Sequence, residues 1–207
     1  MRAVFLALAV LSILAFAAVL GCSFLRSCGD IVILGSASIH LALISSALFM
    51  LWKKDLRSTL DSIGFPGSLK SSLVYTAIGL CAIFSMLLIV GMLSIVLGFN
   101  DQQKVTDKVA GLPPVLLVLA VAFAPLSEEL FFRAFLSPRA GIVASSLLFS
   151  VVHFTYGSVI EVVGVFFVGL LLASVYRMSR SITPCVLTHM AYNLLSISVM
   201  LLLGGRV

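Results

Sequence analysis

Long apolar segments follow one another along almost the whole chain, and this feature restricts the fold more than any other. A membrane-crossing helix needs about 20 mostly apolar residues. Seven segments approach or reach that length, at residues 3–25, 31–52, 73–99, 113–136, 142–156, 159–176 and 182–203. The chain is 61% hydrophobic and only 10% charged, against about 25% charged residues in a soluble domain. We predict an all-α fold, a polytopic transmembrane bundle of seven helices, with eight spans as the alternative.

The ends and connectors of these segments refine the prediction. The first apolar run follows Arg2 as in a signal peptide, but it is long enough to cross a bilayer and we interpret it as a retained helix. Between the second and third runs, Leu56, Leu60 and Ile63 recur at helical spacing in a polar stretch, which predicts a short surface helix at residues 55–63. No linker or repeat divides the chain, so residues 1–207 are predicted to form one domain.

The positive charges lie in the connectors, where they indicate orientation and contact with lipid headgroups rather than nucleic acid. With seven spans, eight Lys and Arg residues fall on the side of the N-terminus and four on the other, leaving out Arg133 inside a span. Because cytoplasmic loops carry the excess of cations, we expect a cytoplasmic N-terminus. The bilayer is thus an expected partner of the chain, and nucleic acid is not.

Ionisable residues inside the spans are the strongest functional signal. Each costs about 2.5–3.5 kcal/mol at the centre of a membrane helix, so such residues mark function by default. The fourth span, the fifth span and the seventh span contain Glu128, Glu129, Arg133, His153, His189 and Asn193. At about 1.5 Å per residue, Glu128, His153 and His189 lie roughly 13, 18 and 12 Å from the same membrane face. Three helices are therefore predicted to share one polar pocket.

Helical spacing suggests how these residues divide their roles. Glu129 and Arg133 are four residues apart and can pair, whereas Glu128 is rotated by about 100° and can face elsewhere. The same spacing relates His189 to Asn193 and Phe149 to His153, so that Phe149 is predicted to shape the pocket wall.

Two kinds of chemistry suit this set of side chains. A carboxylate and an imidazole can activate water, while a second histidine and an asparagine donate hydrogen bonds to an oxyanion. Alternatively, Glu128, His153 and His189 could bind zinc and leave one position open for water. The sequence alone leaves both mechanisms open; no other cofactor is predicted.

Three short motifs, in order, resemble those of the CAAX prenyl endopeptidase and bacteriocin-processing (CPBP, or Abi) family. Residues 128–133 match EExxxR, residues 149–153 match FxxxH, and residues 189–193 match HxxxN. EExxxR alone is a weak pattern, but three motifs in order and in separate spans are specific. They lie within residues 112–203, which we take as the motif-bearing core of the domain.

The resemblance implies an intramembrane endopeptidase acting on a prenylated CAAX protein or a bacteriocin-like peptide. It implies that Glu128 is the general base with His153 assisting, and that His189 and Asn193 form the oxyanion site. Glu129 and Arg133 are then the supporting pair. Family members often have eight spans, whereas seven are predicted here, which leaves the substrate class open.

Other interpretations remain at this stage. The polar cluster could belong to a non-catalytic peptide-binding membrane protein, such as an immunity or chaperone-like factor, or to a small proton-coupled transporter. Outside the motifs, His40 is interpreted as an internally satisfied histidine and Glu161 as an interfacial residue.

Overall fold

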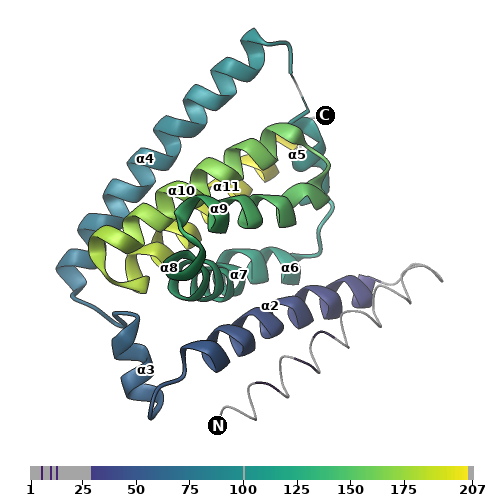
Figure 1. Cartoon of the computed structure of the whole chain (residues 1–207). Helices are drawn as coiled ribbons and strands as arrows, with labels where there is room; N and C mark the ends of the chain where they lie inside the picture. Colours follow the sequence, from purple (N-terminus) through teal and green to yellow (C-terminus); the bar gives the residue numbers. More distant parts are fainter. Residues whose placement is uncertain (1–5, 7–9, 11–12, 14–28, 100, 205–207) are drawn as a thin grey trace.

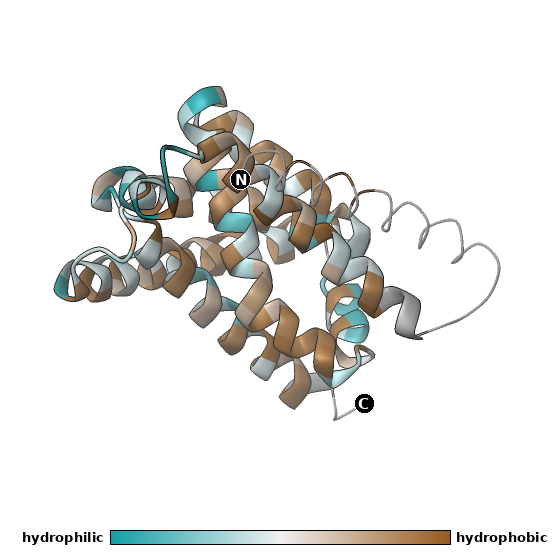
Figure 2. Ribbon diagram, turned by 90° about the horizontal axis from the view of Figure 1, so that it is seen from below, coloured by the Kyte–Doolittle hydropathy of each residue, from teal (hydrophilic) through white to brown (hydrophobic). Residues whose placement is uncertain are grey.

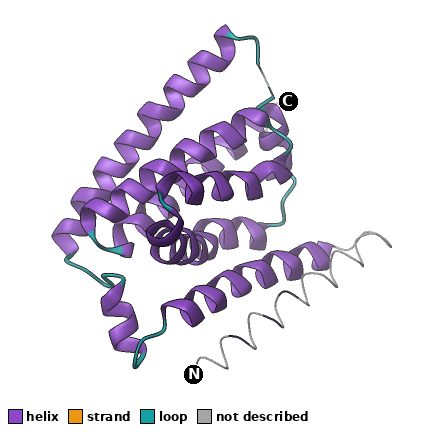
Figure 3. Cartoon of the chain, in the orientation of Figure 1, coloured by secondary structure: helices purple, strands orange, loops and turns teal. Residues whose placement is uncertain are grey.

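The computed structural model describes residues 29–99 and 101–204 together with positions 6, 10 and 13, and within them it contains helices and no strands (Figure 3). The predicted first span, residues 3–25, therefore lies outside the described residues apart from those three positions. The main helices are α2 (Gly29–Leu51), α3 (Leu56–Ser62), α4 (Leu69–Val96), α5 (Gln103–Ala110), α9 (Ile142–Val152), α10 (Val159–Ser179) and α11 (Ile182–Gly204). The all-α prediction is confirmed.

The motif EExxxR lies in a continuous helical segment whose pitch changes along its length. It consists of α6 (Pro114–Val118), the π-helical η1 (Leu119–Phe123), α7 (Ala124–Glu128), the π-helical η2 (Glu129–Leu136) and α8 (Ser137–Ala140). The fourth apolar segment was predicted to end at residue 136, whereas the helix continues through α8. It ends at Gly141, whose φ of +86° favours glycine.

Five described helices are long and apolar enough to cross a membrane: Ile33–Leu51, Leu69–Val96, Pro114–Ala140, Val159–Ser179 and Ile182–Leu202. The predicted fifth span, Ile142–Tyr156, is a shorter apolar helix that ends in the 3-10 turn η3 (His153–Tyr156). Figure 2 shows hydrophobic colouring along most of the helical ribbon, with hydrophilic residues mainly in loops and at helix ends.

Two amphipathic helices connect the long ones. The surface helix predicted at residues 55–63 is present as α3, whose N-cap Asp55 accepts a hydrogen bond from Ser58 N. Helix α5 was missed, because residues 100–111 looked like a polar connector. Its Val105 and Val109 are buried, whereas Lys104 and Lys108 donate to the carbonyls of Gly157 and Thr155. Helix α5 is thereby attached to the loop that follows His153.

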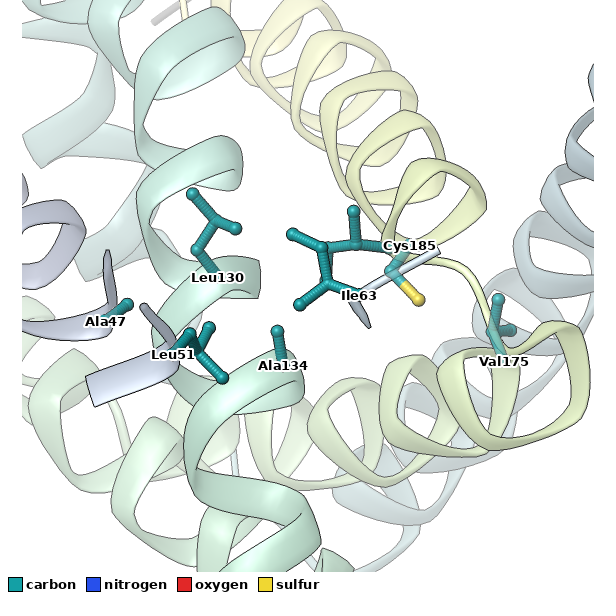
Figure 4. Close-up of a cluster of buried hydrophobic side chains, with 8 residues drawn as sticks. Ala47, Leu51, Ile63, Leu130, Ala134, Val175 and Cys185 are labelled. Carbon is teal, nitrogen blue, oxygen red and sulfur yellow. The ribbon is translucent and has the colours of Figure 1, made fainter. Parts of the chain in front are cut away.

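In the assembled bundle, α2 and α4 lie on opposite sides of the motif-bearing helices (Figure 1). Helix α2 packs on α7 and η2, whereas α4 packs on α10 and α11. Figure 4 shows the main core cluster, in which Ala47 and Leu51 of α2 and Leu130 and Ala134 of η2 take part. The cluster is completed by Ile63, Val175, Ile182 and Cys185. This core joins α2, η2, α10 and α11 beside the polar residues.

Small residues set two of the close helix contacts. A Cβ atom added to Gly79 in α4 would lie 3.0 Å from two side-chain atoms of Thr188, the residue before His189. At Gly169 in α10, an added Cβ would lie 2.9 Å from the Cβ of Ser146 in α9. Lipid offers helices little hydrophobic driving force to associate, so such close van der Waals contacts stabilise the bundle.

Candidate active site

Glu129 and Arg133 form an enclosed ion pair behind the wall of the site. Their side chains are 0% and 1% exposed, and Arg133 Nε lies 3.1 Å from Glu129 Oε2. The guanidinium carbon of Arg133 also lies 4.1 Å from the centre of the Phe149 ring, a cation–π contact. This burial suits a structural role, because removing either charge would leave the other buried without its counter-charge.

Glu129 also binds the second histidine, a contact that the sequence analysis did not predict. His189 Nδ1 lies 2.9 Å from Glu129 Oε1. An ionised carboxylate has no hydrogen to donate, so the proton of this bond belongs to Nδ1. Glu129 thus connects the HxxxN motif to EExxxR and fixes the orientation of the His189 ring.

Glu128 faces a cavity instead. Its side chain is 14% exposed, and its Oε2 lies 3.8 Å from His189 Nε2. The cavity has a volume of about 530 Å³ and is lined by Glu128, His153, His189 and Asn193 together with Phe149. The structure therefore brings the three motifs around one space. What each residue does there remains a prediction.

His153 is oriented by its own helix. Its Nδ1 lies 2.8 Å from the carbonyl oxygen of Phe149, and because a carbonyl can only accept, Nδ1 carries the hydrogen. Nε2 of the neutral ring is then an acceptor. The ring packs between Phe149, at 4.8 Å between centroids, and Tyr156, at 6.2 Å.

Asn193 donates a hydrogen bond to a backbone carbonyl that has no partner within its own π-helical turn. The N–H of Ala124 bonds to Leu119 O rather than to Ala120 O, and Pro125, the next residue, has no N–H. The Ala120 carbonyl therefore lacks a partner within its helix. Asn193 Nδ2 fills this role at 2.9 Å and keeps a second N–H that the cavity can use.

The cavity also contains polar residues outside the predicted site. They are Ser36, His40, Lys108, Thr155, Tyr156, Glu161, Tyr192 and Ser196. Glu161 is the third residue of α10, and its backbone N–H bonds to the N-cap Ser158. His40 could have been predicted as a cavity residue because it is a lone ionisable residue in an apolar run. It was not, because it lies far from the three motifs in the sequence.

The zinc alternative can be compared with this geometry. Among the residues that the structure describes, no group of three or more His, Cys, Asp or Glu side chains is arranged to hold a metal ion. As placed, Glu128, His153 and His189 do not fit the zinc site considered from the sequence. We assign no step of the reaction to a metal.

Comparison with known proteins gives one match. Residues 110–195 match the family model described as type II CAAX prenyl endopeptidase Rce1-like, which is less than half of the chain. No curated protein and no solved structure matches the chain significantly. The matched range contains all three motifs, and the five apolar helices support an integral membrane protein. Residues 110–195 of the chain are thus similar to the Rce1-like family of type II CAAX prenyl endopeptidases.

Proposed function

We propose that the protein is an intramembrane endopeptidase that hydrolyses a peptide bond in a prenylated CAAX protein. The observation that carries this proposal is the shared cavity, in which Glu128 meets His153, His189 and Asn193. The Rce1-like match supports the substrate class. A bacteriocin-like precursor is the second substrate to test, because the wider family includes such peptidases.

The proposed reaction starts with a water molecule between two acceptors. Glu128 carboxylate and His153 Nε2 both accept hydrogen bonds, so a water that donates to both presents a lone pair to the substrate carbonyl. As the C–O bond forms, Glu128 takes the proton from the water. It then delivers this proton to the leaving amine when the C–N bond breaks.

The oxyanion that forms in this step needs donors. The free N–H of Asn193 supplies one. His189 Nδ1–H is committed to Glu129, so donation from Nε2 requires the doubly protonated ring. Glu129 Oε1 lies 2.9 Å from Nδ1 of that ring, and Glu128 Oε2 lies 3.8 Å from its Nε2. We propose that His189 shares the oxyanion site with Asn193.

The test is a cleavage assay of the purified full-length protein in lipid nanodiscs. The substrates are a farnesylated CAAX peptide, the same peptide without the farnesyl group, and a bacteriocin-like precursor, each with and without a chelator. We expect the farnesylated peptide to be cut, with chelator causing no loss. Glu128→Gln is the matched control for contaminating peptidases. Binding of a peptide without cleavage would instead support a non-catalytic peptide-binding protein.

The membrane topology also belongs to this proposal. We propose seven spans and a cytoplasmic N-terminus in a single domain, supported by the eight-to-four distribution of cations. Single cysteines placed at positions 2 and 206 of a cysteine-free variant would be labelled from opposite sides. Labelling of both from one side contradicts an odd number of spans.

A further inference from the structure

The N-terminal half of the chain contributes a third histidine to the cavity. His40 lies in α2, 70 residues before the start of the matched range, and no motif includes it. Its side chain nevertheless lines the same cavity as Glu128, His153 and His189. The packing of α2 on α7 places it there.

Hydrogen bonding fixes which nitrogen of His40 is free. Its Nδ1 lies 2.8 Å from Ser127 Oγ, and Ser127 Oγ in turn lies 2.8 Å from the carbonyl of Ala124. The serine hydroxyl has one hydrogen, and the carbonyl must receive it. Ser127 Oγ therefore accepts from His40 Nδ1–H. Nε2 is left as an acceptor, and it has no hydrogen-bond partner within residues 29–99 and 101–204.

The same arrangement recurs in all three histidines of the chain. Each uses Nδ1 to bind the protein, through Ser127 for His40, the Phe149 carbonyl for His153 and Glu129 for His189. Each also lines the cavity. A histidine that only joined two helices would need no access to this space, whereas His40 has both an anchor and cavity access. Its anchor, Ser127, directly precedes Glu128.

The chemistry of a peptide in this cavity indicates what Nε2 can bind. An extended peptide carries backbone N–H groups, and each costs free energy if it is buried without an acceptor. The cavity lining includes Leu116, Ala120 and Ala124, which offer no side-chain acceptor, and Ser36, whose hydroxyl can both donate and accept. We infer that His40 is a substrate-binding residue whose Nε2 accepts a hydrogen bond from a backbone N–H of the peptide substrate. The inference rests on the proposed peptidase function.

Two substitutions separate this role from a structural one. In His40→Asn, the amide nitrogen replaces Nδ1 and keeps the bond to Ser127, but nothing reaches the position of Nε2. In His40→Gln, the longer amide reaches the position of Nε2 and loses the bond to Ser127. A binding role predicts that Asn is the more harmful change, whereas a helix-joining role predicts that Gln is.

The experiment measures peptide binding rather than turnover, in a Glu128→Gln background. A farnesylated CAAX peptide with a fluorophore is titrated onto Glu128→Gln protein in nanodiscs, with and without each His40 substitution. We expect His40→Asn to weaken binding about fivefold to tenfold, the effect of one lost hydrogen bond. We expect His40→Gln to restore most of that loss, with unchanged thermal stability in His40→Asn. Ser127→Ala removes the hydroxyl that orients the His40 ring but keeps the imidazole itself. It should weaken binding by about twofold.

Three results would overturn the inference: undiminished binding by His40→Asn, weaker binding by His40→Gln than by His40→Asn, or no binding to the Glu128→Gln parent. Should His40→Asn not fold, undiminished binding by Ser127→Ala overturns it. Failure of the proposed function looks different, because the peptide would then bind to the Glu128→Gln protein while the unsubstituted protein leaves it uncut. In an active enzyme, the same His40→Asn change should raise KM and leave kcat nearly unchanged.

Discussion

Glu128 and Glu129 are adjacent in the chain but lie in opposite surroundings. Glu129 is fully enclosed with Arg133 and His189, whereas Glu128 opens onto the cavity. Adjacent residues of a helix point in different directions. The Glu129 carboxylate therefore contacts fixed partners, whereas the Glu128 carboxylate can contact a substrate. The enclosed side thus orients His189, and the cavity side carries the groups that we propose to react.

The largest effect is expected from exchanging the two glutamates for glutamine one at a time. Glu128→Gln should lower kcat by about 100- to 10,000-fold, because a general base is lost, and the protein should remain folded. Glu129→Gln should instead destabilise the protein by about 3–5 kcal/mol, because it leaves Arg133 buried without its counter-charge. Steady-state kinetics and thermal unfolding of both variants measure the two effects.

Two results would contradict this division of roles between Glu128 and Glu129. Full activity in Glu128→Gln excludes it as the base, and a stable, fully active Glu129→Gln protein shows that the enclosed pair has no structural importance. The single variant Arg133→Gln serves as a matched control, since it leaves the charge of Glu129 unbalanced in the same place.

Substitution of Asn193 tests whether one residue can contribute both to stability and to catalysis. Asn193→Ala should lower kcat about 100- to 1000-fold with little change in KM, as loss of an oxyanion donor does. The structure adds a second expectation, because the Ala120 carbonyl loses its partner, which costs about 1–3 kcal/mol of stability. Kinetics measured below the unfolding temperature separate the two. An unchanged kcat with a lowered Tm would assign Asn193 to the enclosed side alone.

The sequence predicted the residues of the site better than their connections. Helical periodicity predicted that Glu129 pairs with Arg133, and similar depths within the spans predicted that Glu128, His153 and His189 share one pocket. The hydrogen bond from His189 to Glu129 joins residues 60 positions apart. Neither hydropathy nor spacing along one helix can predict a contact between residues so far apart in the sequence. The π-helical turns were also missed, because α-helical periodicity was assumed throughout. Helix α5 was overlooked because eight mostly polar residues resemble a loop.

The smallest effect is expected far from the glutamates, at Asp101. Its carboxylate accepts hydrogen bonds from Ser158 Oγ, Val159 N and Ile160 N at the start of α10. Desolvation raises the pKa of Asp101, but these bonds and the nearby Lys104 outweigh it and lower the pKa below its usual value. Asp101→Asn should lower stability by about 1 kcal/mol, as loss of a helix cap does, without changing kcat.

The pH dependence checks the origin of that effect. Because the folded-state pKa is lowered, the stabilisation is present above the unfolded-state pKa, and it is lost as the pH falls through the lower folded-state value. The difference in Tm between the unsubstituted protein and Asp101→Asn should therefore disappear in strong acid. A difference that is independent of pH would show that the carboxylate charge does not contribute.

The close contacts at Gly79 and Gly169 have a consequence for any attempt to transplant the site. Thr188 and Ser146, which they touch, lie in the helices that carry His189 and Phe149. Grafting the three motifs onto another helical bundle would transfer the motif side chains but not the separation of the helix axes. A shift of about 1 Å in a reacting group can reduce the rate about 100-fold. A designer would therefore have to copy two residues that carry no functional group at all.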